Sequence, residues 1–186
     1  MTAEKDAVAT VAGLMALAAR TAPKGKGQDE ILITVLTDVQ KKKVATAMQE
    51  YGTKNGVGFF LRDAGNVAAS DACIVIGARG KAYVGINCGA CGYPTCAAFA
   101  KATGKAKTQN TPFAGPNCAV RMTDLGIAVG SAAKTAQIHN VDNRIMYSAG
   151  SIAMALGFLG RDCTAAYAIP LSVSGKSIYF DRPTSK

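Results

Sequence analysis

Four cysteines in the middle of the chain restrict what this segment can fold into. They follow the pattern C-x2-C-x4-C-x21-C, at Cys88, Cys91, Cys96 and Cys118. Gly89 and Gly92 stand between the first three, and glycine lets a backbone curl tightly. Three thiolates within nine residues can therefore converge on one metal centre. The fourth ligand would then come from a distant loop, as is usual for iron–sulfur sites.

The surroundings of these cysteines suit a negatively charged centre. No Asp or Glu occurs between Asp71 and Asp124, and the stretch holds several basic residues: Arg79, Lys81, Lys101, Lys105, Lys107 and Arg121. Backbone N–H groups of a curled loop also stabilise charge on cluster sulfurs. We therefore predict an iron–sulfur cluster on the four cysteines. The spacing matches neither common ferredoxin pattern, so by itself it does not choose between [4Fe–4S] and [2Fe–2S].

Other uses of the cysteines compete with this prediction. Disulfides suit secreted proteins, but the apolar stretch 8–19 follows Glu4 and Asp6 rather than a basic segment and is too short to span a bilayer. We accordingly expect a cytoplasmic protein without a membrane span. A redox C-x2-C pair would leave Cys96 and Cys118 unexplained. A zinc site remains as an alternative, although structural zinc normally uses two short cysteine pairs.

The remaining reactive residues are few. Cys73 lies within an expected strand and Cys163 follows Arg161 and Asp162, and we predict that both are buried structural thiols. A single histidine, His139, excludes a multi-histidine metal site. It is expected at the end of a long helix, where its charge would suit the helix dipole. A role as proton donor is the alternative.

The net charge of +9 invites a nucleic-acid interpretation. The chain has no nucleic-acid-binding motif, and aromatic residues make up only 6% of it. The run Lys41–Lys43 is expected to be a solvated helix face. We therefore expect no nucleic-acid partner. An acidic electron-carrier protein fits the charge better, because a basic surface steers an acidic partner.

Hydrophobic periodicity predicts alternating helices and strands. Helices are expected over 7–20, 39–51, 97–103, 124–139 and 142–159. Strands are expected over 31–36, 72–76 and 165–171, with 178–180 as an addition to the sheet. The type of the apolar segment 59–61 is left open. The layout indicates an α+β fold with one mixed sheet covered by helices.

The cysteine motif resembles known cluster modules. The segment Cys88-Gly-Ala-Cys-Gly-Tyr-Pro-Thr-Cys96, followed by Phe99 and Ala100, resembles the four-iron cluster domain of Rnf-type electron-transport complexes. It is also similar to the cluster module of corrinoid iron–sulfur proteins. The resemblance implies one [4Fe–4S] cluster on Cys88, Cys91, Cys96 and Cys118.

A second resemblance covers most of the remaining chain. The segments 18–23 and 31–37, the helix beginning Asp124-Leu125-Gly126, and the segments 156–159 and 168–171 resemble the nitroreductase family. As a whole, the chain is similar to an uncharacterised family of ferredoxin-domain proteins from anaerobic prokaryotes. The resemblance implies a single nitroreductase-like domain over 1–186, with an inserted cluster-binding segment over 84–122.

The nitroreductase resemblance has consequences for cofactor and activity. It implies a homodimer that binds FMN at its interface, with the flavin phosphate held by basic residues near both chain ends, namely Lys24, Lys26, Lys176 and Arg182. The expected function is electron transfer by an iron–sulfur protein, coupled to FMN-dependent reduction of a small acceptor by an oxidoreductase. The alternative is a non-enzymatic sensor or protein-interaction module that contains the cluster.

Overall fold

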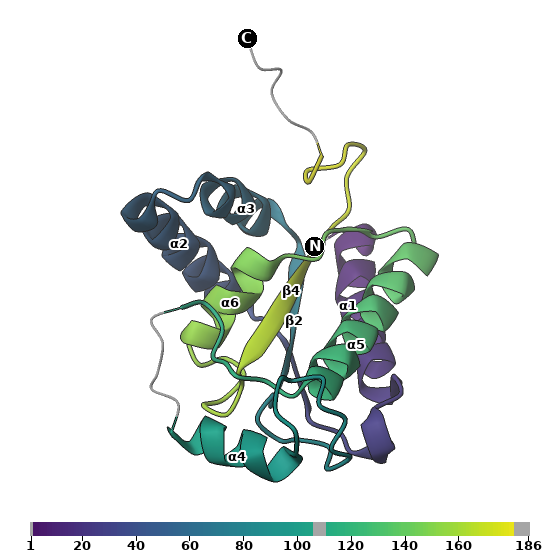
Figure 1. Cartoon of the computed structure of the whole chain (residues 1–186). Coiled ribbons are helices and arrows are strands. Elements are labelled where there is room, and N and C mark those ends of the chain that lie inside the picture. The colour runs from purple at the N-terminus through teal and green to yellow at the C-terminus, as the bar shows by residue number, and fades with distance from the viewer. Residues whose placement is uncertain (1, 106–110, 181–186) are drawn as a thin grey trace.

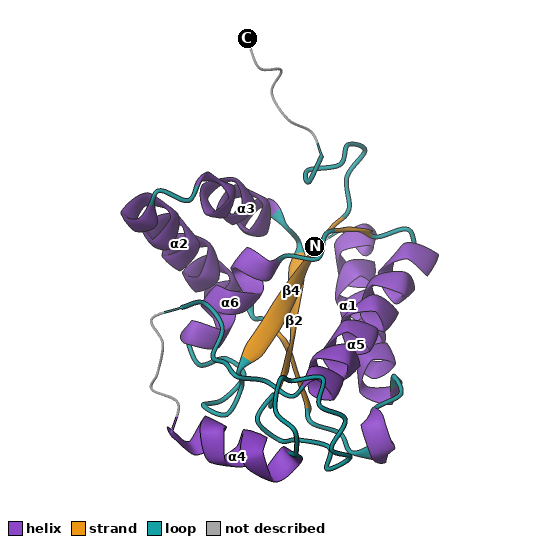
Figure 2. Cartoon of the chain, viewed as in Figure 1, coloured by secondary structure: helices purple, strands orange, loops and turns teal. Residues whose placement is uncertain are grey.

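A four-stranded sheet divides the helices of the chain into two layers. The computed structural model describes residues 2–105 and 111–180. Helices α2, α3 and α6 lie on one side of the strands, and α1 and α5 lie on the other (Figures 1 and 2). Helix α4 and the cysteine-rich loop lie at one end of the sheet, and the C-terminal segment leaves from the opposite end. The α+β fold class is confirmed.

The sheet has the strand order β1-β2-β4-β3. The strands are β1 (Ile31–Val35), β2 (Ala72–Ala78), β3 (Asp142–Asn143) and β4 (Ala165–Ser172). Every pairing among these strands is antiparallel, so the expectation of a mixed sheet is wrong in this respect. The central strands β2 and β4 are covered on both faces, which explains their nearly continuous apolar sequences.

Two hydrophobic cores lie on the two faces of the sheet. Alternate residues of β2 point to opposite faces, as the pleat requires. Ile74 and Ile76 belong to the core beneath α1 and α5, whereas Cys73 and Val75 belong to the core beneath α2, α3 and α6. Each aliphatic side chain buried in this way contributes about 1.5–3 kcal/mol. Strand β2 therefore joins the two layers into one unit.

Apart from the last, the predicted helices run longer than the sequence indicates. They are α1 (Ala3–Thr21), the short 3-10 helix η1 (Gly25–Gly27), α2 (Asp38–Asn55), α3 (Gly58–Ala69), α4 (Cys96–Lys105), α5 (Ala119–Ile138) and α6 (Tyr147–Ala155). The segment 59–61, whose type the sequence leaves open, is part of helix α3. None of the helices in the described parts of the chain is both long and apolar enough to cross a membrane.

Helix α2 shows why one predicted boundary is wrong. The helix begins with a capping box between Thr37 and Gln40. It does not stop at Gly52, but continues to Gly56, which adopts a left-handed conformation with φ 66°. A Cβ atom on Gly52 would lie 2.8 Å from Leu61 Cδ2 of α3. Gly52 therefore permits close helix packing rather than ending the helix.

Three further expectations are corrected. Lys41 is not part of a solvated face: it is 7% exposed, and its ammonium group hydrogen-bonds the carbonyl oxygens of Ser70 and Asp71 at the end of α3. The predicted helix 142–159 is interrupted, because β3 and an isolated bridge from Met146 to Ala168 precede α6. Residues 178–180 form a turn instead of a strand.

Candidate iron–sulfur centre

All four predicted ligand cysteines line one pocket at the end of the sheet that carries α4. The space between the residues that line the pocket is about 300 Å³, and part of this space is open to solvent. Cys88 is exposed, Cys91 and Cys96 are half-buried, and Cys118 is buried. Within the described residues, no three His, Cys, Asp or Glu side chains form a site for a single metal ion. Four thiols around a common space fit a polynuclear cluster, which takes one thiolate for each iron.

The loop that carries the first three cysteines is tightly curled. Positive φ angles occur at Gly85 (80°), Asn87 (52°), Gly89 (73°) and Gly92 (84°). The N–H of Gly92 donates to the carbonyl oxygen of Gly89 over 2.9 Å, which closes a turn over residues 89–92 that follows Cys88 and contains Cys91. The predicted role of Gly89 and Gly92 agrees with these angles, since glycine adopts positive φ without steric cost.

A pair of hydrogen bonds between Asn87 and Cys96 joins the two ends of the loop. The backbone N–H of Cys96 donates to Asn87 Oδ1 over 2.8 Å, and the backbone N–H of Asn87 points to Cys96 Sγ at 3.4 Å. Thr95 Oγ1 accepts from the N–H of Ala98 over 3.1 Å and thereby caps the first turn of α4. Cys96 is thus fixed both by the loop and by the helix that it begins.

Cys118 reaches the pocket from the start of α5, where it is the N-cap residue. Its N–H donates to the carbonyl oxygen of Gly80 over 2.7 Å. A Cβ atom on Gly80 would lie 2.1 Å from Asn117 Oδ1 and 2.6 Å from Thr164 Oγ1, so glycine is required for this close approach. The peptide bond between Gly115 and Pro116 is cis. The segment just after β2 therefore positions the fourth cysteine.

A buried ion pair lies one turn further along α5. Arg121 Nη1 is 3.1 Å from Asp124 Oδ2. The guanidinium also donates to the carbonyl oxygen of Ala82 and to both the carbonyl and side-chain oxygens of Gln28. Asp124 Oδ1 accepts from the N–H of Gly25 over 2.9 Å. The pair thus ties η1 and the loop after β2 to the helix that carries Cys118.

The wall of the pocket is apolar and aromatic. Phe99 of α4 is fully buried. Its ring contacts Tyr83 and Tyr93 edge to face, with centroid distances of 6.3 and 5.8 Å. Val84 and Val120 also belong to the wall, and none of the described residues that line the pocket is charged. Such a wall keeps water away from the inner side of a bound cluster.

Of the basic residues predicted to hold a flavin phosphate, the three that the structure describes do not all come together within one chain. Lys24 follows the C-terminal end of α1, and its ammonium donates to the carbonyl oxygens of Ala19 and Arg20 and pairs with Asp29. Lys26 is exposed in η1. Lys176 is in the segment near the other end of α1, which is about 28 Å long. Arg182 lies outside the described residues.

The remaining candidates lie away from the pocket. His139 caps the C-terminal end of α5, a helix about 30 Å long whose other end carries Cys118. Cys73 and Cys163 are buried, as predicted. Burial raises the pKa of the Cys73 thiol to about 12 and that of the Cys163 thiol to about 11. Both are therefore protonated at neutral pH.

Comparison with known proteins connects this pocket with a family. The model of the family described as "Uncharacterized protein containing a ferredoxin domain (DUF2148)" matches residues 114–182. The model described as "Putative Fe-S cluster" matches residues 85–109. An uncharacterized protein of Archaeoglobus fulgidus is 44% identical over 183 residues, which cover 98% of this chain and 96% of the relative. The chain belongs to the ferredoxin-domain family.

Solved structures place this ferredoxin-domain protein on a nitroreductase-like fold. Nitroreductase A from Vibrio parahaemolyticus has a TM-score of 0.54 at 10% identity, over 95% of this chain and 60% of that one. The NADPH:FMN oxidoreductase from Vibrio harveyi also has 0.54 at 10%, over 95% and 62%. A BluB-like flavoprotein from Clostridium difficile has 0.53 at 13%, over 100% and 86%. The chain thus spans less than two thirds of either Vibrio enzyme, and these likenesses concern the fold alone.

Sequence reasoning missed several residues that position the centre. Arg121 was counted with the basic residues around the cysteines, but it is buried and paired with Asp124. Asn87 and Gly80 carry no recognisable motif, although Asn87 directly precedes the first cysteine. The family matches and the fold together support an iron–sulfur redox role for the ferredoxin-domain protein.

Proposed function

We propose that this ferredoxin-domain protein carries one [4Fe–4S] cluster and transfers single electrons. Its ligands are Cys88, Cys91, Cys96 and Cys118. The observation that carries the proposal is the position of all four cysteines around one pocket. The domain comprises residues 1–186, and residues 84–122 are the inserted cluster-binding segment, which lies between the end of β2 and the first turn of α5.

The protein groups around the pocket have separate tasks. A bound cluster of this type supplies one-electron chemistry at a potential that depends on hydrogen bonds to sulfur and on solvent exposure. The N–H of Asn87 is directed at Cys96 Sγ and stabilises its negative charge. The N-terminal end of α5 does the same for Cys118, because its free N–H groups carry partial positive charge. Phe99, with Tyr83 and Tyr93, keeps water from the inner side.

We extend the proposal to a homodimer that uses FMN to reduce a small acceptor. The nitroreductase-like fold favours this extension, since one structural neighbour is described as an NADPH:FMN oxidoreductase. Because Lys26 and Lys176 lie near opposite ends of α1, a phosphate site that uses both would need two chains. The cluster would then transfer single electrons, and the flavin would carry out the two-electron reduction of the acceptor.

The alternative function is a sensor or interaction module in which the cluster does not transfer electrons. The exposure of Cys88 favours this alternative, because a cluster with an exposed ligand is accessible to oxidants. Reversible reduction distinguishes the electron-transfer function from the sensor function. The cluster of an electron carrier is reduced and reoxidised without loss of iron, whereas a sensor cluster is degraded or altered by the oxidant.

An anaerobic absorption spectrum before and after dithionite tests the proposal. We expect a broad brown charge-transfer band that bleaches and returns on reoxidation, with about four irons per chain if the cluster is [4Fe–4S]. Resolved flavin peaks would support the FMN extension, and their absence would refute it without affecting the cluster. Cys88→Ser should remove most of the iron. A colourless protein that contains zinc would overturn the proposal.

A further inference from the structure

The surface of the cluster loop is uncharged over an unusual length. The nineteen residues from 82 to 100 include no Asp, Glu, Lys or Arg. Residues 85–90 are all exposed, and two large apolar side chains at the pocket stand out to solvent: Ile86 is 50% exposed and Tyr83 is 43% exposed. We call these residues, 83 and 85–90, the neutral cap. It covers the outer side of the pocket that the four cysteines line.

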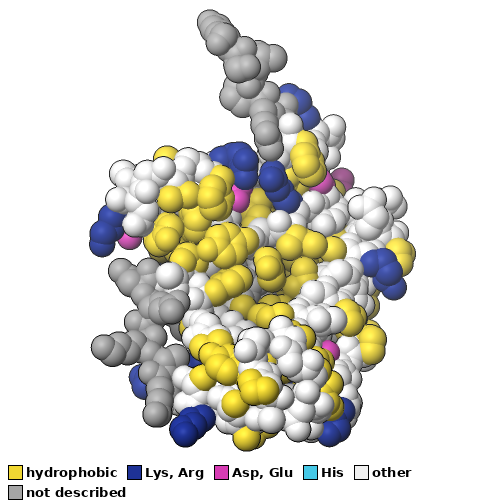
Figure 3. All heavy atoms as spheres, viewed as in Figure 1, with side chains coloured by type: hydrophobic (Ala, Val, Ile, Leu, Met, Phe, Trp, Pro, Cys, Tyr) yellow, Lys and Arg dark blue, Asp and Glu magenta, His cyan; other side chains and the backbone are white. Residues whose placement is uncertain are grey.

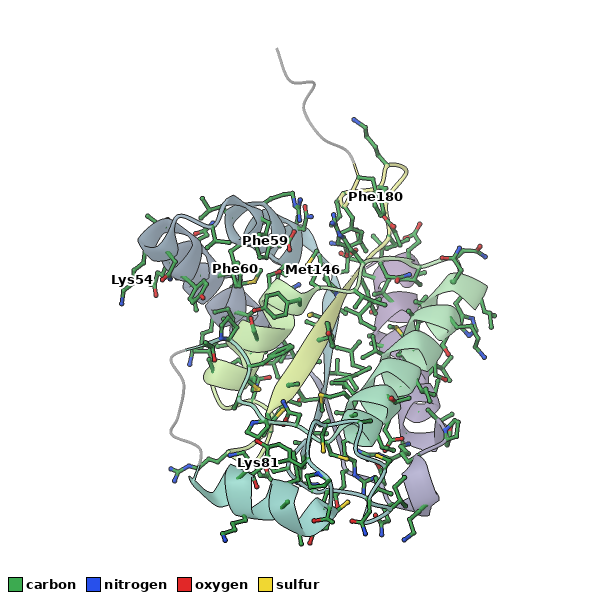
Figure 4. All side chains as sticks on the ribbon, viewed as in Figure 1. Lys54, Phe59, Phe60, Lys81, Met146 and Phe180 are labelled. Carbon is green, nitrogen blue, oxygen red and sulfur yellow. The ribbon has the colours of Figure 1, made fainter. Side chains whose placement is uncertain are left out.

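Lysines surround the neutral cap. Lys81 and Lys101 stand directly before and after the uncharged stretch, and both are exposed. The ring contact between Tyr83 and Phe99 brings the loop that holds Lys81 against α4, which holds Lys101. Figure 4 shows Lys81 at the α4 end of the molecule, and Figure 3 shows apolar and uncharged side chains at that end with Lys and Arg at its margins.

A third lysine comes from the N-terminal half of the chain. A Cβ atom on Gly25 would meet Val120 and Val84, which both line the pocket, so η1 lies directly against the pocket wall. The next residue, Lys26, is exposed. Asp124, the one acidic residue of α5, is buried, pairs with Arg121 and accepts a hydrogen bond from the N–H of Gly25. The described rim therefore presents positive charge from three separate segments.

We propose that the neutral cap is the docking surface for an acidic single-electron carrier protein, with Lys81 and Lys101 facing its carboxylates and Lys26 adding positive charge at the edge of the surface without contacting the partner. The inference rests on the proposed electron-transfer function and names its partner. An apolar centre with a charged rim is the arrangement of a transient protein interface: the centre excludes water and the rim steers the encounter. A second copy of this chain is a poor occupant, because two such rims would bring lysines face to face.

The test is the rate at which a reduced acidic ferredoxin delivers an electron to the oxidised holoprotein, followed by stopped flow without oxygen. The charge reversal Lys81→Glu combined with Lys101→Glu should lower the second-order rate constant about tenfold or more at low ionic strength. The same variant should weaken the dependence of the rate on salt. Lys54→Glu reverses one charge at the exposed end of α2, away from the cap (Figure 4), and should leave the rate within about twofold, whereas Lys81→Glu alone, with the same change in net charge, should lower it clearly.

Reduction by dithionite, a small molecule that needs no docking surface, distinguishes the docking proposal from the electron-transfer function on which it rests. If dithionite reduces every variant alike and the ferredoxin rate still does not respond to the reversals or to salt, the docking surface is wrong and the redox function stands. If dithionite does not cycle the wild-type cluster, the redox function fails and the docking surface with it. Ile86→Gln, at the centre of the cap, should slow the ferredoxin reaction and leave the mass in solution unchanged. A shift from dimer to monomer in light scattering would instead make the cap an interface between copies and overturn the proposal.

Discussion

Arg121 and Asp124 form a buried ion pair on the first turns of α5, with Nη1 and Oδ2 3.1 Å apart and side chains only 2% and 5% exposed. Arg121 is three residues after Cys118, and its other hydrogen bonds go to Ala82 and Gln28. The pair therefore joins the helix that carries the fourth cysteine to the segments before and beneath the cluster loop. Because both charged side chains are buried, the loss of one charge would leave the other uncompensated.

We expect Asp124→Asn to lower the free energy of unfolding by about 3–5 kcal/mol, since it leaves the Arg121 guanidinium buried without a charge partner. Urea denaturation of the cluster-free protein measures the effect. Asp162→Asn is the matched control, because Asp162 pairs with Arg79 but its side chain is 59% exposed. An exposed pair contributes about 0–1 kcal/mol. Equal losses in the two variants would contradict the structural role of the buried pair.

Asn87 should be needed for full cluster occupancy. Asn87→Gly keeps the positive φ and the backbone N–H directed at Cys96 Sγ, but removes the oxygen that accepts from the N–H of Cys96. Asn87→Ala removes the same oxygen but keeps a Cβ atom at φ 52°, which costs roughly 1–2 kcal/mol relative to glycine. Iron content should therefore fall in the order wild type, Asn87→Gly, Asn87→Ala.

The control for Asn87 is Asn140, which has nearly the same φ of 54° but follows the far end of α5. Asn140→Ala should leave the iron content unchanged and reduce only stability. If the Asn140 and Asn87 variants lost iron equally, backbone strain and not the contact with Cys96 would explain the loss.

Much of the fold follows from local sequence patterns. The largely apolar runs of β1, β2 and β4 are short and bounded by polar or turn residues, and each strand forms close to where it is predicted. Helix α1 and the capping box of α2 are likewise local signals. The cysteine spacing was enough to predict which four side chains share a pocket. These features depend on neighbours in sequence, and a single sequence therefore contains them.

The missed features depend on contacts between distant segments. The sequence suggests that Gly52 ends a helix, but in the structure this glycine lets α3 pack closely against α2. The sequence likewise suggests that Lys41 is solvated, but its ammonium group is bound by a carbonyl oxygen at the end of α3. The break at β3 is set by pairing with β4. Gly80 shows no signal at all, because its partners Asn117 and Thr164 lie far along the chain. The position of Cys118 likewise depends on contacts between segments that are distant in the sequence.

Gly80→Ala should displace the fourth cysteine. Its Cβ atom would stand 2.1 Å from Asn117 Oδ1 and 2.6 Å from Thr164 Oγ1, so the side chain of Asn117, which directly precedes Cys118, must move. We expect a clear loss of iron, measured by metal analysis after anaerobic reconstitution. Gly126→Ala adds the same methyl group on α5 in open space and should keep its iron and match or exceed wild-type stability. Full iron content in Gly80→Ala would contradict the assigned role of this glycine.

The six cysteines should differ in their reaction with iodoacetamide in the cluster-free protein. Burial raises the pKa of Cys73 to about 12 and that of Cys163 to about 11, so at pH 8 both are thiols and unreactive. Cys88 is exposed and should react first. Because the raised values favour the protonated folded form, any stability these thiols contribute is present at neutral pH and is lost as the pH rises towards 11–12. Peptide mass spectrometry identifies the modified residues, and rapid labelling of Cys73 in folded protein would contradict its burial.

The proposed homodimer is tested by multi-angle light scattering at micromolar protein. We expect a mass of two chains, each of 19.1 kDa, because a flavin phosphate site that combines Lys26 and Lys176 needs two copies. The double change Lys26→Gln and Lys176→Gln should weaken FMN binding at least about tenfold, since each lysine would lose a charge-assisted hydrogen bond to phosphate. The cluster spectrum should persist in this variant, because neither lysine lines the cysteine pocket. A monomer that retains its cluster and binds no flavin would leave a simple electron carrier and remove the FMN-dependent activity from the proposed function.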